Sequence, residues 1–369
     1  MIFQVLLSVL VLATATTVGG IIIPTGDSDS NIIRMFVAYC PTDFTGAGAI
    51  VDVDPITANW TIKAHVKLPS EVFGCVADYS PKYDFDHKDP NTLWFDFTSD
   101  DGFFLAVDTR FGNTTKVSSG DLFFTGFLNF KYIASDNKLQ GLSGTVTENG
   151  FCFDGCIAYG HQDIVGRPRY VQEGLLPFKE VPDDTSVINW EKGTYHFQAA
   201  YDLRDTPCAP TQSDQCLLSV NMSNGKMLSS TYTPHYDVFK FGRHVRPGGN
   251  VSAFMVGFNT FCNASDETSY VFGKVNLETA TGYPTGCVNQ SVVIQTDEWI
   301  SSNSLDDKWF ATGSGNGDGD DPQLLVFDAE TAAVKTQSEL HGLASALRAK
   351  MGLIFIWALE FVEKASPAV

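Results

Sequence analysis

The chain has 369 residues, with 43 Asp or Glu against 24 Lys or Arg, so its formal net charge is −19. This charge argues against a nucleic-acid partner, because phosphates would be repelled, and it is compatible with cations or basic partners. A chain of this length can bury a large hydrophobic core, and its 28 phenylalanines support that expectation.

The first segment predicts export. Residues 1–20, MIFQVLLSVLVLATATTVGG, are apolar, short for a membrane span, and end in small residues with Ala13 and Ala15 in a cleavage-site spacing. We expect a secretory signal peptide at 1–20, a single mature domain at 21–369, and a secreted, extracellular protein without a membrane span. A retained membrane anchor is the alternative, although no Lys or Arg precedes the apolar run.

Glycosylation sequons agree with export. The pattern N-x-S/T predicts N-glycans on a surface, at Asn59, Asn113, Asn221, Asn250, Asn263 and Asn289.

The cysteines also agree with export. Their number, eight, is even, as is typical of disulfide-bonded secreted proteins. Neighbours along the chain suggest four pairs: Cys40 with Cys75, Cys152 with Cys156, Cys208 with Cys216, and Cys262 with Cys287. Sequence does not fix this connectivity. A zinc site is the competing interpretation, but the chain has no CxxC pair and no histidine cluster beside the cysteines.

A strand-and-turn pattern recurs six times. An apolar strand ends in Asp or Asn and usually turns through Thr, Ser or Gly: IVDVDPIT with Asp54, FLAVDTRFGN with Asp108, FCFDGC with Asp154, LLSVNMSNG with Asn221, FGKVNLETATG with Asn276 and LLVFDAET with Asp328. The copies are on average about 55 residues apart, which is typical of propellers and other repeat folds. Such a side chain can bond its own backbone two residues on, so we expect these six residues to form turns.

Other short strands complete each repeat. One precedes the pattern, as in MFVAYC, LWFDFT, LSGTV, YHFQAA, AFMVGF and WFATG, and two follow it, as in WTIKAHVKL and FLNFKYIA. Four strands per repeat, with turn signals between them and almost no helical periodicity, predict an all-β fold. The expected architecture is a β-propeller of six or seven four-stranded antiparallel blades.

These repeats resemble the β-propeller superfamily, in particular the secreted YVTN and quinoprotein-like group, whose blades carry a VDxxTG strand end. Thr279 to Gly282 is the nearest match to that ending. The resemblance covers about residues 31–362 and is architectural, so it implies a fold and carries over no catalytic residue. A β-helix or two stacked sandwiches are the alternatives.

The C-terminal segment does not fit the strand count. A ring of six blades needs one closing strand, for which HGLASALRA (341–349) is available. GLIFIWALEF (352–361) is then one strand too many for six blades and leaves seven blades two strands short. The apolar positions of residues 338–363 also fit a C-terminal helix.

An acidic rim is the strongest functional signal. The loops expected between second and third strands hold twelve acids against one base, Arg204: Asp43, Asp100, Asp101, Glu148, Asp202, Asp205, Asp214, Asp266, Glu267, Asp318, Asp320 and Asp321. Turn chemistry is one explanation. The other is a Ca²⁺ site at Asn316, Asp318, Asp320 and Asp321, where oxygen ligands alternate as they do in calcium loops, although this is not an EF-hand.

Two functions follow. The leading one is a secreted, glycosylated binding or matrix module with an extracellular protein or glycan partner. The alternative is a secreted propeller hydrolase of lactone or glycoside substrates, with a divalent metal in the central channel. Polar residues of an enzyme should meet on the innermost strands, whereas those of a binding module should spread over a rim. No motif of a known catalytic class is present.

Overall fold

The computed structural model divides the chain into two units, residues 1–30 and 31–369. All described residues belong to the second unit: 32–41, 46–69, 72, 82–85, 91–97, 102–118, 127–133, 138–144, 146–147, 150–151, 157–164, 169–176, 186–189, 192–199, 216–232, 240–241, 252–258, 270–276, 281–287, 299–302, 309–314, 321–328 and 330–362. The predicted signal peptide therefore lies outside the described residues.

The described strands form six four-stranded antiparallel sheets and one two-stranded hairpin. Sheet I contains β26 (Ala349–Val362), β1 (Ile32–Pro41), β2 (Ala47–Val53) and β3 (Trp60–Lys67); sheet II contains β4 (Lys82–Phe85), β5 (Thr92–Phe97), β6 (Phe103–Asp108) and β7 (Thr114–Ser118); sheet III contains β8 (Phe127–Ile133), β9 (Lys138–Gly144), β12 (Ile157–Asp163) and β13 (Arg169–Leu176).

The remaining sheets continue in the same order. Sheet IV contains β14 (Ser186–Asn189), β15 (Thr194–Ala199), β16 (Cys216–Asn221) and β17 (Met227–Tyr232); sheet V contains β18 (Lys240–Phe241), β19 (Ser252–Phe258), β20 (Tyr270–Asn276) and β21 (Thr281–Cys287); sheet VI contains β22 (Trp299–Ser302), β23 (Trp309–Ser314), β24 (Gln323–Asp328) and β25 (Val334–Glu339). The hairpin pairs β10 (Val146–Thr147) with β11 (Gly150–Phe151), and the helix α1 (Leu343–Leu347) lies between β25 and β26.

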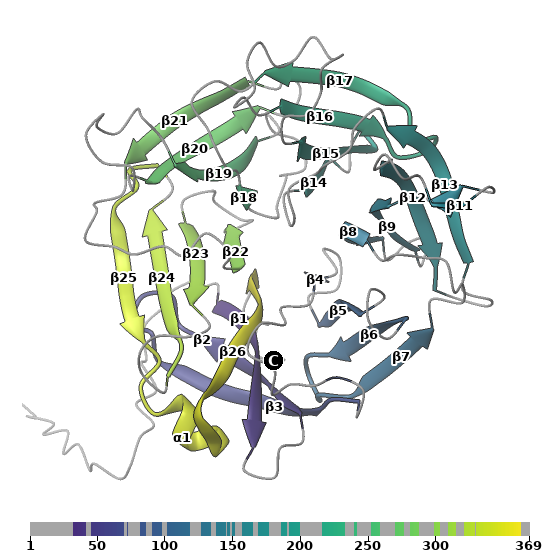
Figure 1. Cartoon of the computed structure of the whole chain (residues 1–369). Coiled ribbons are helices and arrows are strands. Elements are labelled where there is room, and N and C mark those ends of the chain that lie inside the picture. Colours follow the sequence, from purple (N-terminus) through teal and green to yellow (C-terminus); the bar gives the residue numbers. More distant parts are fainter. Residues whose placement is uncertain are drawn as a thin grey trace, which may run out of the picture. The chain divides into compact units, whose positions relative to one another are not determined.

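The sheets are arranged as in a β-propeller (Figure 1). In every sheet the four strands lie side by side in the same order, and the first strand is nearest the centre. These first strands contact one another from sheet to sheet: β4 with β8, β8 with β14, β18 with β22, β22 with β26, and β26 with β4. The predicted all-β fold and propeller arrangement are thus confirmed.

One of the six predicted repeat strands was wrong. The third strand of sheet III is β12, which ends at Asp163, and not the segment FCFDGC with Asp154, of which only Phe151 is described, in the hairpin β10–β11. With Asp163 in place of Asp154, successive repeat positions are 54, 55, 58, 55 and 52 residues apart. The hairpin is an insertion between β9 and β12, and its Phe-Cys-Phe pattern imitates a blade strand.

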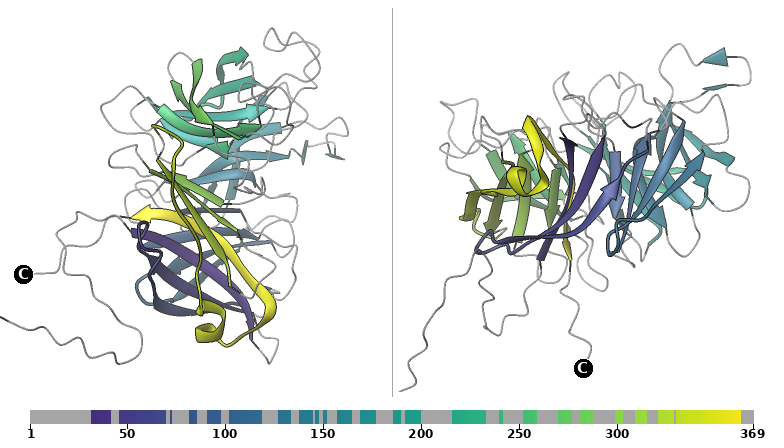
Figure 2. Two further views of the ribbon diagram at one scale, coloured as in Figure 1. Left: turned by 90° about the vertical axis from the view of Figure 1, so that its left-hand side faces the viewer. Right: turned by 90° about the horizontal axis from the view of Figure 1, so that it is seen from below.

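The C-terminal segment closes the ring. β26 pairs with β1 along almost its whole length, from Ile32 opposite Val362 to Pro41 opposite Ala349, and Figures 1 and 2 show the two strands side by side. The prediction that HGLASALRA is the closing strand was wrong, because residues 341–348 form α1 and its flanking turns, and only Ala349 belongs to β26. The long C-terminal helix was also wrong: β26 is an innermost strand buried on both faces, and such strands lack an alternating pattern.

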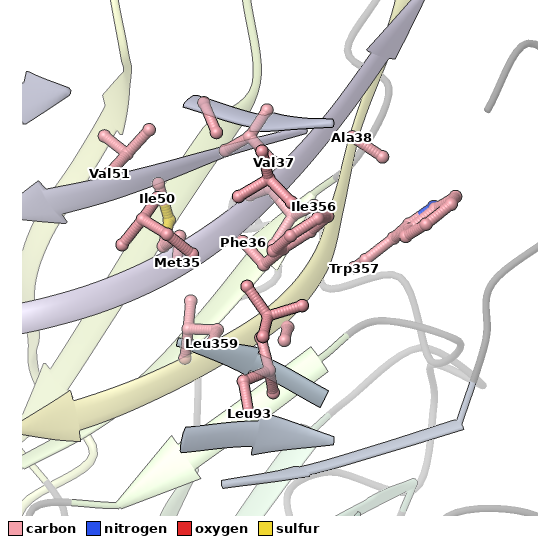
Figure 3. Packing of buried hydrophobic residues seen from close by; sticks show 14 of the residues in the cluster. Met35, Phe36, Val37, Ala38, Ile50, Val51, Leu93, Ile356, Trp357 and Leu359 are labelled. Atoms are coloured by element: carbon pink, nitrogen blue, oxygen red, sulfur yellow. The ribbon is translucent and has the colours of Figure 1, made fainter. Parts of the chain in front are cut away.

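A bulge in β26 directs Trp357 into the core. Phe36 is opposite Ala358 and Val37 is opposite Ile356, so Trp357 is the extra residue, and a bulge re-aims the side chain it carries. The indole is 1% exposed and stacks on Phe36 with ring centroids 5.9 Å apart (Figure 3). It also meets Phe95 of sheet II edge-on at 5.9 Å, which joins the first two sheets.

Two polar contacts strengthen the same junction between sheets I and II. The Tyr83 hydroxyl on β4 donates to the Leu359 carbonyl at 3.2 Å and accepts from the Leu359 N–H at 3.3 Å. The buried Arg34 guanidinium binds both oxygens of Asp52, at 2.8 and 3.1 Å, and donates to Thr109 of sheet II at 3.3 Å. The backbone groups of Leu359 on β26 and the buried charge of Arg34 therefore both have hydrogen-bond partners.

The predicted Asp and Asn turns are confirmed at four positions. Asp54, Asp108, Asn221 and Asp328 each begin a six-residue turn in which the side chain accepts from the N–H two residues on, at 2.8 to 3.0 Å. The first residue's N–H donates to the sixth residue's carbonyl, and the fifth residue's N–H donates to the first residue's carbonyl. The fifth residue has a positive φ in all four: Ala58, Gly112, Gly225 and Ala332.

These turns also contact the neighbouring sheet. The Thr336 hydroxyl on β25 donates to Pro55 in the turn of sheet I at 2.7 Å. A Cβ on Gly112, in the turn of sheet II, would lie 2.1 Å from the His65 carbonyl oxygen on β3. A Cβ on Gly286 of β21 would lie 2.9 Å from the Thr331 carbonyl oxygen in the turn of sheet VI. Each of these three turns therefore packs on the outermost strand of the preceding sheet.

The fifth turn position gives a paired prediction. Gly112→Ala should lower the free energy of unfolding by at least about 2 kcal/mol, because it adds left-handed strain and drives a Cβ into the His65 carbonyl. Ala58→Gly should raise that free energy by about 0.5 to 1 kcal/mol, because Ala58 already has φ of 55°. Urea unfolding of both variants measures these changes in the free energy of unfolding. A change of the same sign and size in both variants would contradict the prediction.

Candidate cation site

Strand pairing in sheet VI brings three ligand-type side chains together. Gln323 at the start of β24 is opposite Glu339 at the end of β25, and the Leu340 N–H donates to the Pro322 carbonyl at 2.9 Å. Asp321 therefore lies across from His341. Ligand atoms of Asp321, Glu339 and His341 all lie within 4.8 Å of one another.

Asp321 is fixed by the start of α1. One carboxylate oxygen accepts the Gly342 N–H at 2.6 Å, and the other accepts the Ala344 N–H at 2.6 Å. Gly342 has φ of 80°, which turns the chain out of β25 into the helix. Each oxygen has a second lone pair, so the carboxylate is oriented by these bonds and can still coordinate an ion.

Of the other two side chains, His341 is exposed and Glu339 is half-buried, like Asp321. His341 Nδ1 and Glu339 Oε2 are 3.7 Å apart, and their side chains are 81% and 34% exposed. The His341 carbonyl accepts the Trp60 Nε1–H of β3 at 3.2 Å, which ties this residue to sheet I. The group thus lies at the junction between sheets VI and I, with solvent access for an ion.

The sequence predicted only one member of this group. Asp321 was predicted as a cation ligand, whereas Asn316, Asp318 and Asp320 lie outside the described residues. Glu339 and His341 were missed, because the strand register that places them beside Asp321 is not visible in local sequence. The sequence signal that could have identified these two residues is an acid and a histidine two positions apart at the end of a strand.

The acidic loops occupy the positions that the sequence predicted. Five of the six join the second and third strands of their sheets, and TVTENG (145–150) is part of the longer connection from β9 to β12 that includes the hairpin β10–β11. Of their twelve acids, only Asp321 is among the described residues.

Three of the sequons are described. Asn59 and Asn113 are exposed and Asn221 is half-buried, whereas Asn250, Asn263 and Asn289 lie outside the described residues. Cys40 and Cys287 are disulfide-bonded, but none of the pairs is described, so the predicted connectivity stays a prediction.

Within the described ranges, the group at Asp321 is the one set of three His, Cys, Asp or Glu side chains with a metal-type separation. It lies just before β24, at the end of β25 and in the turn into α1, and not on the innermost strands. The same ranges contain no helix long and apolar enough to cross a membrane.

No family model matches the chain, and no curated protein matches it. Among solved structures, an oligogalacturonate lyase in complex with manganese is similar over 82% of this chain and 84% of its own, with a TM-score of 0.43 and 11% identity. The Pseudomonas aeruginosa periplasmic gluconolactonase PpgL is similar over 89% of this chain and 99% of its own, with a TM-score of 0.44 and 9% identity. Similarity at this level carries no argument about function.

A second polar group surrounds His196 in sheet IV. The imidazole is 3% exposed, with Thr194 Oγ1 2.8 Å from Nε2 and Ser219 Oγ 2.8 Å from Nδ1. Ser229 donates to Ser219 at 2.9 Å. A serine beside a histidine is a possible nucleophile pair, but Ser219 is only 3% exposed, so we interpret the group as a buried structural network.

Burial gives this network a pH dependence. Desolvation, helped by the charge of Lys192, lowers the pKa of His196 from 6.5 to about 4. Because the folded pKa lies below the unfolded one, the contribution to stability is complete above pH 6.5 and is lost as the pH falls toward 4. The full loss is about 3 kcal/mol.

Urea unfolding at pH 7.5 and 4.5 tests this. His196→Gln retains an amide donor and acceptor but does not titrate in this range. The wild type should lose about 2 to 3 kcal/mol more stability than the variant between these pH values. Equal losses would show that His196 does not carry the effect.

Proposed function

We propose that this protein is exported and acts as an extracellular binding module, whose rim holds a divalent cation at Asp321, Glu339 and His341. The observation that carries the proposal is the meeting of these three ligand-type side chains at one junction between sheets. The bound ion would organise the surrounding acidic rim for an extracellular protein or glycan partner.

The proposed architecture is a propeller of six blades, each being one four-stranded sheet. The common strand order of sheets I to VI supports this number, as do the contacts between their innermost strands. The pairing of β26 with β1 supports closure of the ring within the first blade.

The ligand set favours a transition metal over Ca²⁺. Imidazole nitrogen suits Zn²⁺ and similar ions, and carboxylates suit Mn²⁺, Mg²⁺ and Ca²⁺. An all-oxygen site built from Asn316, Asp318 and Asp320 would instead favour Ca²⁺. The two possibilities differ in the residues they require, so they can be separated by mutation.

The position of the ligands favours a binding module over a hydrolase. A metal in the central channel would draw its ligands from innermost strands. Glu339 is on the outermost strand of sheet VI, and Asp321 and His341 flank that strand pair at the rim.

The cation should stabilise the folded protein. A ligand present at a hundredfold excess over Kd contributes about 2.7 kcal/mol, which should raise Tm by roughly 5 °C in Zn²⁺ or Mn²⁺ relative to EDTA. Glu339→Gln and His341→Gln should each remove most of this rise, measured by calorimetry. Asp321 is left intact because it also holds α1.

His65→Gln is the matched control, because His65 is an exposed histidine on the outermost strand of sheet I. It should leave the metal-dependent rise unchanged. If Asp318→Asn with Asp320→Asn removes a Ca²⁺-dependent rise that His341→Gln does not affect, the site lies in the acidic loop. If no divalent ion raises Tm, the cation site is rejected.

Export is tested separately. Expressed with its own leader in a eukaryotic secretory host, the protein should appear in the medium without its first 15 to 20 residues, as shown by N-terminal mass spectrometry; this range follows from Ala13, Ala15 and the small residues after them. Retention in the cytosol would contradict the proposed location.

A further inference from the structure

Two exposed apolar side chains lie in copies of the same turn. Only four large apolar side chains are exposed in the described part of the chain, and two of them, Ile56 at 55% and Phe111 at 68%, lie in copies of the six-residue turn. Ile56 is third in the turn that Asp54 begins, and Phe111 is fourth in the turn that Asp108 begins. Isolated apolar exposure is ordinary, but repetition in the same turn of consecutive sheets calls for a cause.

The same two turns carry a sequon at their sixth position, Asn59 and Asn113. The other two described turns have Lys226 and Ala333 there. Their third and fourth residues are polar: Ser223 and Asn224, and Glu330 and Thr331. In the two turns with a sequon the exposed apolar residue lies inside the turn. In the two without one, the exposed apolar residues, Leu228 and Val334, lie just after the turn.

Both asparagines can carry a glycan in the folded protein. Their side chains are exposed, and the turn contacts use their backbone groups: the carbonyls accept the Asp54 and Asp108 N–H at 2.9 and 2.8 Å, and the Asn59 N–H donates to Thr57 Oγ1 at 3.3 Å. Asn221 differs, because it begins its turn and its side-chain oxygen accepts from the N–H and hydroxyl of Ser223 at 2.8 and 2.6 Å. A sugar on Asn59 or Asn113 leaves the turn's hydrogen bonds intact.

We infer that N-glycans on Asn59 and Asn113 cover the exposed side chains of Ile56 and Phe111 and stabilise these turns. Two consecutive peptide units span at most about 7.6 Å between Cα atoms, so the first sugar on Asn113 is within reach of Phe111. The C–H face of a sugar can remove apolar area of the ring from water.

The Phe111 ring lies beside the Arg110 guanidinium. The Arg110 guanidinium lies 5.4 Å from the ring centroid and is itself fixed to Asp108 by hydrogen bonds of 3.0 and 2.7 Å. Hydrogen bonds from Arg110 lower the pKa of Asp108 below its usual value. The Arg110 guanidinium lies beside the ring, but Phe111 is still 68% exposed, so a glycan can contact it.

The inference rests on the export part of the proposed function. Its test therefore uses protein that is secreted without depending on the native leader. The full mature chain is secreted from a eukaryotic host behind a heterologous signal peptide, and site occupancy is measured by glycopeptide mass spectrometry. Asn59 and Asn113 should both be occupied. Empty sites in secreted protein overturn the inference and leave export standing, whereas failure of the native leader alone rejects export and leaves the inference standing.

Coverage of Phe111 is tested by a double-mutant cycle read as Tm. The Asn113 glycan is removed in two independent ways, by Asn113→Gln and by Thr115→Ala, in Phe111 and Phe111→Ser backgrounds. With Phe111 present, each removal should lower Tm by about 2 to 4 °C. In Phe111→Ser each should lower it by less than about 1 °C. Equal shifts in both backgrounds would show that the glycan does not act through the ring.

Discussion

The pairing of β26 with β1 is the contact on which the rest of the ring depends. It joins segments from opposite ends of the chain, so none of its hydrogen bonds is local, and the loop-closure entropy must be offset by what the pairing buries. The strand that closes the ring is correspondingly apolar: Ile354, Ile356, Leu359 and Phe361 are each at most 3% exposed. Without β26, β1 would be an unpaired edge, and the first strands of sheets II and VI would both lose a neighbour.

The recurring turn makes contacts both within its own sheet and with the neighbouring sheet. Within a sheet it fixes the register of the third and fourth strands through a side-chain bond and two backbone bonds. Between sheets it packs on the outermost strand of its neighbour, at Thr336, His65 and Gly286 in the three described cases. Because a shift of the turn would break both sets of contacts, the repeat positions stay nearly constant in spacing, and extra residues enter elsewhere, as in the hairpin β10–β11.

The sequence predicted what is local and missed what depends on distant pairing. Apolar runs ending at Asp54, Asp108, Asn221 and Asp328 gave correct strands and turns, because the side chain that ends the strand also builds the turn. FCFDGC imitates that pattern without its surroundings, and only the regular spacing points to Asp163. GLIFIWALEF fits a helix and a strand equally well by composition, since a strand buried on both faces has no alternation. Glu339 and His341 become neighbours of Asp321 through the register of β24 and β25, which local patterns do not encode.

The candidate cation site and the closure of the ring depend on the same short segment. Asp321 holds the backbone of Gly342 and Ala344, Trp60 of sheet I holds the His341 carbonyl, and α1 then leads directly into β26. The carboxylates of Asp321 and Glu339 approach each other here, and α1 compensates part of that negative charge with two backbone N–H groups. A cation would compensate the rest only while β24, β25 and the turn into α1 keep this arrangement. The binding free energy of the ion would therefore be coupled to the geometry of the segment that precedes β26. An ion at the rim would then stabilise the pairing of β26 with β1 as well as the charged surface around it.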